Sequence, residues 1–486
     1  MALFGGIEIP GCPDLNNVRK LDVMIQPSIR RMMRLGFAID RDYLWDLGSQ
    51  FGDTLVDLRR EITSHIPPEH LDKFVNDSGL IEDEEGDATI NPASAEQIGR
   101  LLFDCLDVGR GKRDKLKTTK GGDRLTTGKK QLELVKDDHP VVRVLLKYRE
   151  LSKLKTTYID GITKLAKFHP RGPSCPICEL KHDTDQWRVH GEIGTTRAAT
   201  WRFNHRNPNM GNIPVRTMNG QLVLAGFIAP EGRVIYSRDL SQIELRCLAH
   251  LSNCHSMIEV YLADGDIHDN TSRKVFNLKP DEKPDKIKHR MASKRTNFSI
   301  QNGGTEKGLF LQLVMDYGTN NIPIPDWLTE GWCKDFIVAW LNAYPEVQQW
   351  FELQWYRARR YGLSWNPLGF CRLIPEVKSV HQWIREAGLR QAQNLPVTSL
   401  AAGQMKLCMA RSDAVLAGMY EEQSCWPLMT IHDALMFEVD EDRVEEVEAG
   451  TEWAFDGCMD DTETSERMFR TPIKSDGESM VRWMKG

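Results

Sequence analysis

The 486-residue sequence has no apolar run long enough to cross a bilayer, and its first residues form no signal-like pattern. Its 11 cysteines are an odd number and are scattered, which argues against the complete disulfide framework of a small secreted domain. There is also no internal repeat and no low-complexity tract. These absences exclude a membrane-spanning protein and predict a cytoplasmic protein with reduced thiols.

Positive charge is not in excess either, since the net charge is −6. Basic residues concentrate between Arg110 and Lys130, in a stretch that also contains several Thr and Gly residues. Such a loop is suited to gripping phosphates, although a solvated linker explains the charge equally well. The candidate phosphate contacts in this loop are Lys112, Arg113, Lys115 and Lys117.

A chain of this length exceeds one ordinary core, so two or three subdomains are expected. Hydrophobic periodicity predicts that the first third is a helical arm with the basic loop at its tip. The helices expected there cover residues 21–35, with a break at Pro27 and a stop at Gly36, and residues 40–65, 97–106 and 140–168. The elements expected further along are a strand at 234–237, a strand pair at 428–439, and helices at 241–251, 284–313, 331–361, 380–418 and 441–457.

Two aspartates stand where predicted strands end. Asp239 follows the strand 234–237 directly before a helix, and Asp433 lies between two apolar runs in TIHDALMFEV (430–439). Carboxylates at two neighbouring strand ends can hold two divalent ions, and Mg²⁺ is the natural occupant of such an oxygen-lined site. Taken alone, Asp239 would more simply be the N-cap of the following helix.

Three residues of a later predicted helix recur every four positions. Arg290, Lys294 and Phe298 therefore share one helical face. Two cations one turn apart suit a triphosphate, and an aromatic ring one turn further suits a base or a sugar. A membrane-surface or coiled-coil face is the alternative, but KHRMASKRTNFSIQNGG (288–304) lacks the apolar stripe that either would need.

In their order and spacing, these motifs resemble those of DNA polymerase I-like (family A) DNA polymerases over nearly the whole chain. The family's first carboxylate motif, D-Y-S-Q-I-E-L-R, is matched by DLSQIELR (239–246), and its second, V-H-D-E, by IHDA (431–434). Its fingers motif, R-x3-K-x3-F-x3-Y-G, is matched within 290–303, with Asn302 in the tyrosine position. The segment 200–216 is similar to the family's T-G-R…PNLQNIPVR.

The resemblance implies an α+β fold, the right-hand polymerase with a helical thumb, an antiparallel-sheet palm and helical fingers. It divides the chain into an N-terminal extension, a thumb and palm base with a basic tip, a Cys-containing insertion, a first part of the palm, the fingers and a second part of the palm. In that order, the regions are 1–20, 21–168 with the tip at 110–130, 169–187, 188–265, 266–365 and 366–486.

The resemblance also assigns roles to single residues. Asp239 and Asp433 would bind two Mg²⁺ ions, and Lys294 joins them as a catalytic residue. The residues that would bind the nucleotide are Arg290, Lys294, Phe298, Asn302, His268, Gln242 and Glu244. Among these, Glu244 matches the steric gate against ribose. The residues that would bind primer–template DNA are Arg202, Arg390, Asn394, Thr398 and His432.

Three departures from the family pattern bear on activity. Ala434 removes a carboxylate that would assist at the metals, and Thr398 stands where glutamine is usual. Asn302 removes a ring that would pack behind Glu244, so the Glu244 carboxylate should be less fixed and ribose exclusion weaker. The two principal metal ligands and both triphosphate cations remain, so we expect the chain to be active.

The function that these residues predict is template-directed addition of deoxynucleotides to a primer 3′-end by two-metal phosphoryl transfer. Its partners would be primer–template DNA, deoxynucleoside triphosphates and replication proteins acting in trans. Thumb-like sequence begins near Leu21, which predicts no intrinsic proofreading, and the compact form suggests phage or viral replication in a host cytoplasm. The alternatives are a primer-extending polymerase with relaxed sugar selection and a non-catalytic DNA-binding scaffold.

A separate motif lies in the 169–187 insertion. Cys175 and Cys178 form a CxxC pair with His182 and His190 downstream. The pattern partly matches a structural zinc site, because a second CxxC is missing. A surface turn with reduced thiols is the alternative interpretation.

Overall fold

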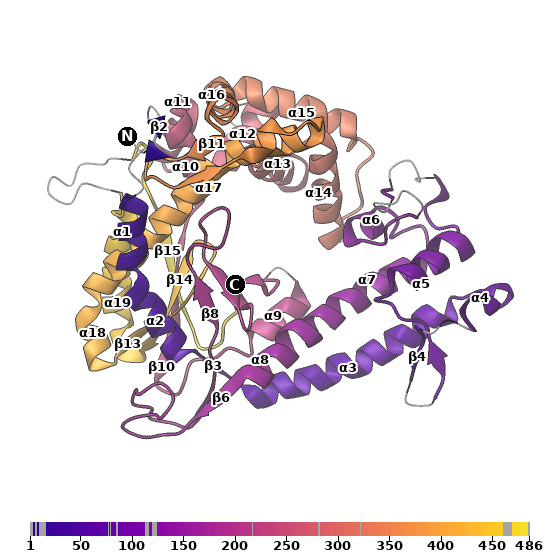
Figure 1. Cartoon of the computed structure of the whole chain (residues 1–486), viewed down its shortest axis with the longest axis horizontal. Coiled ribbons are helices and arrows are strands. Elements are labelled where there is room, and N and C mark those ends of the chain that lie inside the picture. Colours follow the sequence, from indigo (N-terminus) through magenta and orange to yellow (C-terminus); the bar gives the residue numbers. More distant parts are fainter. Residues whose placement is uncertain are drawn as a thin grey trace.

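The computed structural model arranges the chain in three groups of elements, which correspond to the expected thumb, palm and fingers (Figure 1). In this view two long helices run along the bottom, a cluster of helices lies at the top, and a small sheet lies between them at the left. The described residues are 16–75, 77, 79–83, 86–111, 116–118, 124–215, 217–279, 282–320, 322–459 and 469–484, with two short strands at 3–4 and 7–8.

Two long helices form the thumb. α3 (Arg41–Ser64) begins after Asp40, whose side chain accepts a hydrogen bond from Tyr43 N (3.0 Å), and α7 (Pro140–Lys153) packs against it. The helix expected at 40–65 is thereby confirmed. The apolar stripe that α3 buries at helical spacing includes Leu44, Leu47, Phe51, Leu58 and Ile62.

The helix expected at 140–168 ends early. α8 (Asp160–Leu165) gives way to β6 (Ala166–His169), which pairs with β7 (Gln186–Val189). Pairing with a strand that lies far along the chain therefore overrides the local helical periodicity. The insertion 169–187 is the connection between these two strands.

The thumb tip has a small core of its own, built around α5 (Ala95–Gly99) and α6 (Lys129–Leu134). Lys117 is exposed there and precedes Thr118, which forms an isolated bridge with Leu125. α6 also contacts α14 (Glu306–Thr319) of the fingers. The other candidate DNA contacts, Lys112, Arg113 and Lys115, lie outside the described residues.

The palm is a four-stranded antiparallel sheet with the strand order β13-β14-β10-β15. β13 (Cys425–Ile431) and β14 (Ala434–Asp440) are the expected strand pair, and β10 (Arg233–Leu240) extends the strand expected at 234–237. The fourth strand, β15 (Ser475–Met480), has no apolar alternation in its sequence SDGESM, so periodicity did not predict it. Its pairing with β10 alone makes it a strand.

Helices pack around this sheet. α17 (Gln382–Val415) contacts α19 (Val444–Asp456), and α19 lies against β10 and β15. α2 (Gln26–Leu35) packs on β13, and an ion pair between Arg31 and Asp413 (2.7 Å) joins α2 to α17. The helices expected at the two ends of the chain thus cover the palm.

The N-terminal helical segment divides at Pro27, as the sequence predicted. α1 (Asn16–Met24) precedes α2, and Pro27 lies in the first turn of α2, where a missing N–H is harmless. Gly36 ends α2 with φ 69°, and a Cβ there would lie 2.7 Å from Val189 O. β3 (Phe37–Ile39) follows and pairs with β7.

The fingers are helical, as expected, but two of the expected helices are each divided. α13 (Ala292–Gln301) and α14 (Glu306–Thr319) are separated at Gly303, which has φ 67°. α15 (Glu330–Ala343) is separated from α16 (Pro345–Tyr361) because the proline begins a new helix. None of the described helices is long and apolar enough to cross a membrane.

Candidate active site

The two aspartates lie on neighbouring strands at one end of the palm sheet. In the β10–β14 pairing, Asp239 is opposite Ala434. Asp433 directly precedes Ala434, in the two-residue turn that joins β13 to β14. Leu240 N donates to Asp433 O (2.9 Å), which ties this turn to β10. The structure therefore brings together the two carboxylates that the sequence placed at separate strand ends.

The helix that follows β10 is not capped by Asp239. α10 (Ile243–Ser252) has Gln242 at its N-cap, with φ 52°, and Asp239 lies within the strand. Tyr261 Oη donates to Gln242 Oε1 (3.4 Å). The N-cap interpretation of Asp239 is therefore wrong, and its carboxylate belongs to the sheet end.

Two carboxylates lie beside one guanidinium at this end of the sheet, and the charge of a third, Asp239, also acts on Asp433. Arg202 Nη2 forms an ion pair with Glu244 and lies 3.9 Å from Asp433 Oδ1. The pKa of Asp433 is raised to about 6, and burial is the largest cause. The charge of Arg202 opposes this rise, and the charges of Glu244 and Asp239 add to it. Negative charge therefore exceeds positive charge in the site, a surplus that a divalent cation would neutralise.

The donor atoms at this sheet end suit magnesium. Asp239 and Asp433 offer only carboxylate oxygen, the ligand that Mg²⁺ prefers. A cavity of about 270 Å³ is lined by Asp239 and His432, and also by Asp476 and Glu478 of β15. Sequence reasoning missed the last two residues because their strand has no apolar alternation; in the sheet, Asp476 lies directly opposite Asp239.

Glu244 is held at both carboxylate oxygens. Arg202 binds Oε1, and Gln301 Nε2 donates to Oε2 (3.0 Å). Asn302 is exposed and donates instead to the carbonyl of Phe298 (2.7 Å). The expectation of a loosely held Glu244 carboxylate is therefore wrong in this structure, because the buried Gln301 amide, which sequence reasoning missed, supplies a hydrogen bond.

Arg290 is paired with acidic residues of the neighbouring helix. α12 (Ile267–Phe276) begins after Asp266, and Arg290 bonds both Asp266 (2.7 Å) and Asp269 (3.0 Å). The Arg290 side chain remains 37% exposed, and Lys294 is exposed one turn further along. Binding of a triphosphate by Arg290 would exchange carboxylate partners for phosphate oxygens.

His268 is a buried neutral donor. Burial lowers the pKa of His268 to about 4, with Asp266 opposing this effect. Asn297 Oδ1 accepts a hydrogen bond from Trp340 Nε1 (2.6 Å), so the Asn297 amide nitrogen faces His268 Nδ1 (2.9 Å). Nδ1 is then the acceptor, and the ring proton is on Nε2. The Phe298 ring lies 5.9 Å from the His268 ring.

The candidate DNA contacts are placed unequally. His432 is exposed at the tip of the β13–β14 turn, with φ 52°. Arg390 and Asn394 are half-buried on α17, one turn apart. Thr398 is buried and its hydroxyl donates to Asn394 O (3.1 Å), so its role in template binding stays a prediction.

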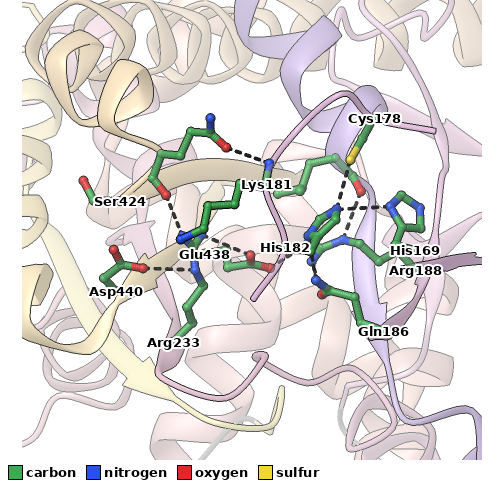
Figure 2. Close-up of polar contacts among 12 residues, drawn as sticks. His169, Cys178, Lys181, His182, Gln186, Arg188, Arg233, Ser424, Glu438 and Asp440 are labelled. Atoms are coloured by element: carbon green, nitrogen blue, oxygen red, sulfur yellow. Dashed lines mark hydrogen bonds and ion pairs between the residues drawn. The ribbon is translucent and has the colours of Figure 1, made fainter. Parts of the chain in front are cut away.

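A second cluster lies in the insertion, and Figure 2 shows its residues His169, Cys178 and His182. The candidate zinc residues Cys175, Cys178 and His182 are buried together with His169, which sequence reasoning missed because it directly follows a predicted helix. Burial lowers the pKa of His169 to about 3 and that of His182 to about 4, so both rings are neutral. His190 is adjacent but outside this group of four.

Comparisons with known proteins agree with this arrangement. The profile described as DNA polymerase family A matches residues 72–485. The thermostable DNA polymerase I of Thermus aquaticus is 35% identical over 74% of the chain, and the DNA polymerase I of Deinococcus radiodurans is 29% identical over 91% of it. The chain spans only 38% and 40% of the length of these two relatives.

A solved structure shows the same fold. The POL domain of Pol1 from M. smegmatis, in complex with DNA primer-template and dNTP, superposes with a TM-score of 0.75 at 25% identity, covering 95% of this chain and 70% of that one. The expected α+β right-hand architecture is thereby confirmed. With the motifs, the fold and the profile match in agreement, the chain belongs to DNA polymerase family A.

Proposed function

We propose that this chain is a template-directed DNA polymerase that adds deoxynucleotides to a primer 3′-end. The observation that carries the proposal is the convergence of Asp239 and Asp433 at one end of the palm sheet, beside the ion pair between Glu244 and Arg202. The Pol1 relative was solved with DNA primer-template and dNTP, which supports the same classes of ligand for this chain.

Asp239 and Asp433 would hold two Mg²⁺ ions in this proposal. When bound, these ions would lower the pKa of the primer 3′-hydroxyl and neutralise charge on the leaving pyrophosphate. The protein's own part is to keep two carboxylates together on paired strands, which the Leu240–Asp433 hydrogen bond maintains. A preorganised site of this kind loses little free energy in reorganisation when the substrate arrives.

The fingers would bind the triphosphate. Arg290 and Lys294 supply positive charge, and His268 can donate from Nε2 without itself being charged. Glu244, fixed by Arg202 and Gln301, would crowd a ribose 2′-hydroxyl. A deoxy-specific enzyme is therefore favoured over one with relaxed sugar selection.

Replacing either metal ligand tests the proposal. Asp239→Asn and Asp433→Asn keep the shape of the side chain but remove its charge, so extension should fall at least about a thousandfold because several kcal/mol of transition-state stabilisation are lost. Binding of primer–template DNA should persist. The measurement is single-turnover primer extension beside a DNA-binding titration.

Asp335→Asn is the matched control, since Asp335 is exposed on α15. Near-normal turnover in Asp239→Asn or Asp433→Asn would refute the assignment of the metal ligands. A wild-type chain that binds primer–template DNA but extends no primer with Mg²⁺ and deoxynucleotides would support the scaffold alternative.

A further inference from the structure

We propose that His169, Cys175, Cys178 and His182 bind one structural zinc ion. All four residues are buried, and one ligand atom from each lies within 4.8 Å of the other three. The site is independent of the proposed function, because none of the four belongs to the carboxylate cluster. The site lies in the insertion that joins β6 to β7, and Figure 2 shows His169, Cys178 and His182 of it.

Three of the distances between the ligand atoms are close to the edges of a coordination tetrahedron. His169 Nδ1 lies 3.3 Å from His182 Nε2 and 3.4 Å from Cys175 Sγ, and Cys178 Sγ lies 3.0 Å from His182 Nε2. Zinc–nitrogen bonds of about 2.0 Å and zinc–sulfur bonds of about 2.3 Å give tetrahedral edges of roughly 3.3 to 3.8 Å. Small adjustments would therefore accommodate the ion.

A chain of hydrogen bonds sets the tautomer of His169. His190 Nδ1 faces the carbonyl of Met33 (2.9 Å), which only accepts, so the proton of a neutral His190 is on Nδ1. Its Nε2 is then an acceptor and faces His169 Nε2 (3.0 Å). His169 must donate from Nε2, which leaves the lone pair of Nδ1 pointing at the cluster. His190 is therefore a positioning residue and not a ligand.

Gln186 is oriented differently toward His182. Its Nε2 donates to His182 Nδ1 (2.6 Å), which places the proton of a neutral His182 on Nε2, the atom that faces the cluster, so metal binding requires the amide to turn. A half-turn of this amide presents Oε1 to an Nδ1–H, which leaves Nε2 unprotonated for the metal. The half-turn gives up the hydrogen bond that Oε1 accepts from Arg188 (2.7 Å), so ion binding and the amide orientation are linked.

The loop that carries the cysteines has the shape of a metal-binding knuckle. Ile177 N donates to Cys175 Sγ (3.4 Å), so the loop backbone fixes the position of this sulfur. Cys175 N donates to Leu180 O (2.8 Å), and Glu179 (φ 59°) N donates to Cys175 O (2.7 Å). The turn therefore aims both sulfur atoms inward.

The identity of the metal follows from the donor atoms. Two thiolates and two imidazoles select zinc over magnesium or calcium, which prefer oxygen. Four protein ligands close the coordination sphere, so no position is left for a substrate and the role is structural. Arg34 donates to the carbonyl of Cys178 and pairs with Glu179 (2.7 Å), so the ion would fasten the insertion to α2.

Metal content of the full chain tests the site. Protein purified under reducing conditions, incubated with Zn²⁺ and dialysed against metal-free buffer should retain about one zinc per chain. The double variant Cys175→Ser/Cys178→Ser and the variant His169→Ala should retain almost none. Cys105→Ser, which removes a free and half-buried thiol of the thumb, should retain as much as the wild type. His190→Gln should still bind zinc, about 10- to 100-fold more weakly.

Two measurements on the wild type keep the test decisive if a variant does not fold. Co²⁺ in place of zinc should produce the thiolate charge-transfer and visible absorption of a tetrahedral site. In magnesium-free buffer, Zn²⁺ should raise the melting temperature and protect both cysteines from alkylation. Wild-type protein that retains no zinc, or a Cys175–Cys178 disulfide in peptide mapping, would overturn the proposal.

Discussion

At the scale of single residues, the Glu244 carboxylate is held by a residue that the sequence patterns did not single out. The sequence has Asn302 where a tyrosine would support Glu244, but the preceding residue, Gln301, donates to Glu244 Oε2 (3.0 Å) from a fully buried position. A hydrogen bond to a charged group stabilises more than one between neutral groups. Gln301 is therefore the residue on which sugar selection should depend.

Gln301→Met tests this dependence, because it keeps the length of the side chain and removes the donor. The ratio of kcat/KM for deoxy- over ribonucleotides should fall about tenfold, the loss of one charge-assisted hydrogen bond. Gln348→Met is a matched control, since the exposed Gln348 amide donates to Glu352 (3.4 Å) on α16. An unchanged ratio in an active Gln301→Met protein would show that Glu244 is held by Arg202 alone.

A buried ion pair gives a second residue-scale prediction, on pH. Arg188 Nη2 bonds Glu438 Oε2 (2.6 Å), and Arg233 approaches the other oxygen (3.3 Å) (Figure 2). Burial alone would raise the pKa of Glu438, but the two arginines lower it below its ordinary value. The Glu438 carboxyl group therefore binds its proton more weakly in the folded chain than in the unfolded chain. The resulting stability is present at neutral pH and is lost as the pH falls through the lowered pKa of the folded state.

Glu438→Gln should therefore lower the free energy of unfolding by about 3 kcal/mol at pH 7, because it leaves Arg188 buried without its counter-charge. The difference from the wild type should narrow in acid, below the ordinary glutamate pKa of about 4.3. Denaturant unfolding of the wild type and of Glu438→Gln at several pH values measures this difference in the free energy of unfolding. The double variant Arg188→Met/Glu438→Leu should recover most of the loss, and a pH-independent difference would contradict the ion-pair explanation.

At the scale of elements, the break between α13 and α14 positions the fingers against the palm. Gly303 has φ 67°, and a Cβ there would lie 2.5 Å from Arg390 Cγ on α17. A close approach of this kind admits only glycine. The helix predicted at 284–313 is interrupted at Gly303, because this residue adopts the left-handed conformation. Helical periodicity in the sequence does not reveal such a backbone conformation.

Gly303→Ala should destabilise the protein by about 1–2 kcal/mol through backbone strain. It should also slow nucleotide addition, since Arg390 must move. Gly161→Ala is the control: Gly161 lies within α8 with nothing near its would-be Cβ, so alanine there should be neutral or slightly stabilising. Thermal unfolding and single-turnover extension measure both effects, and equal behaviour of the two variants would rule out a special role for Gly303.

At the scale of the whole molecule, the thumb tip is the part that we expect to grip duplex DNA. Neutralising Lys112, Arg113, Lys115 and Lys117 should weaken DNA binding without changing base selection. Each lost phosphate contact should lower the slope of log K against log salt by about 0.9 on B-DNA. Neutralising the exposed Lys181 and Lys334, outside the thumb, is the control. If the slope does not change, the basic loop is better explained as a solvated linker.

The sequence by itself predicted most of the helices and singled out the two candidate metal ligands. Long runs with a period near 3.6 predicted α3 and α17, and the breaker Pro27 predicted the division of α1 from α2. Asp239 and Asp433 were noticed at the ends of predicted strands, and their role as metal ligands was assigned by the resemblance to family A polymerases. These signals are local, because each depends on residues that lie within about one or two helical turns of one another.

Only the tertiary structure decided which residues meet. β15 is a strand because β10 pairs with it, and His169 joins Cys175 because β6 replaces the end of a predicted helix. Gln301 reaches Glu244 across 57 residues of sequence. Periodicity describes how a segment relates to itself, whereas hydrogen-bond partners, burial and pKa shifts depend on segments far apart in the chain.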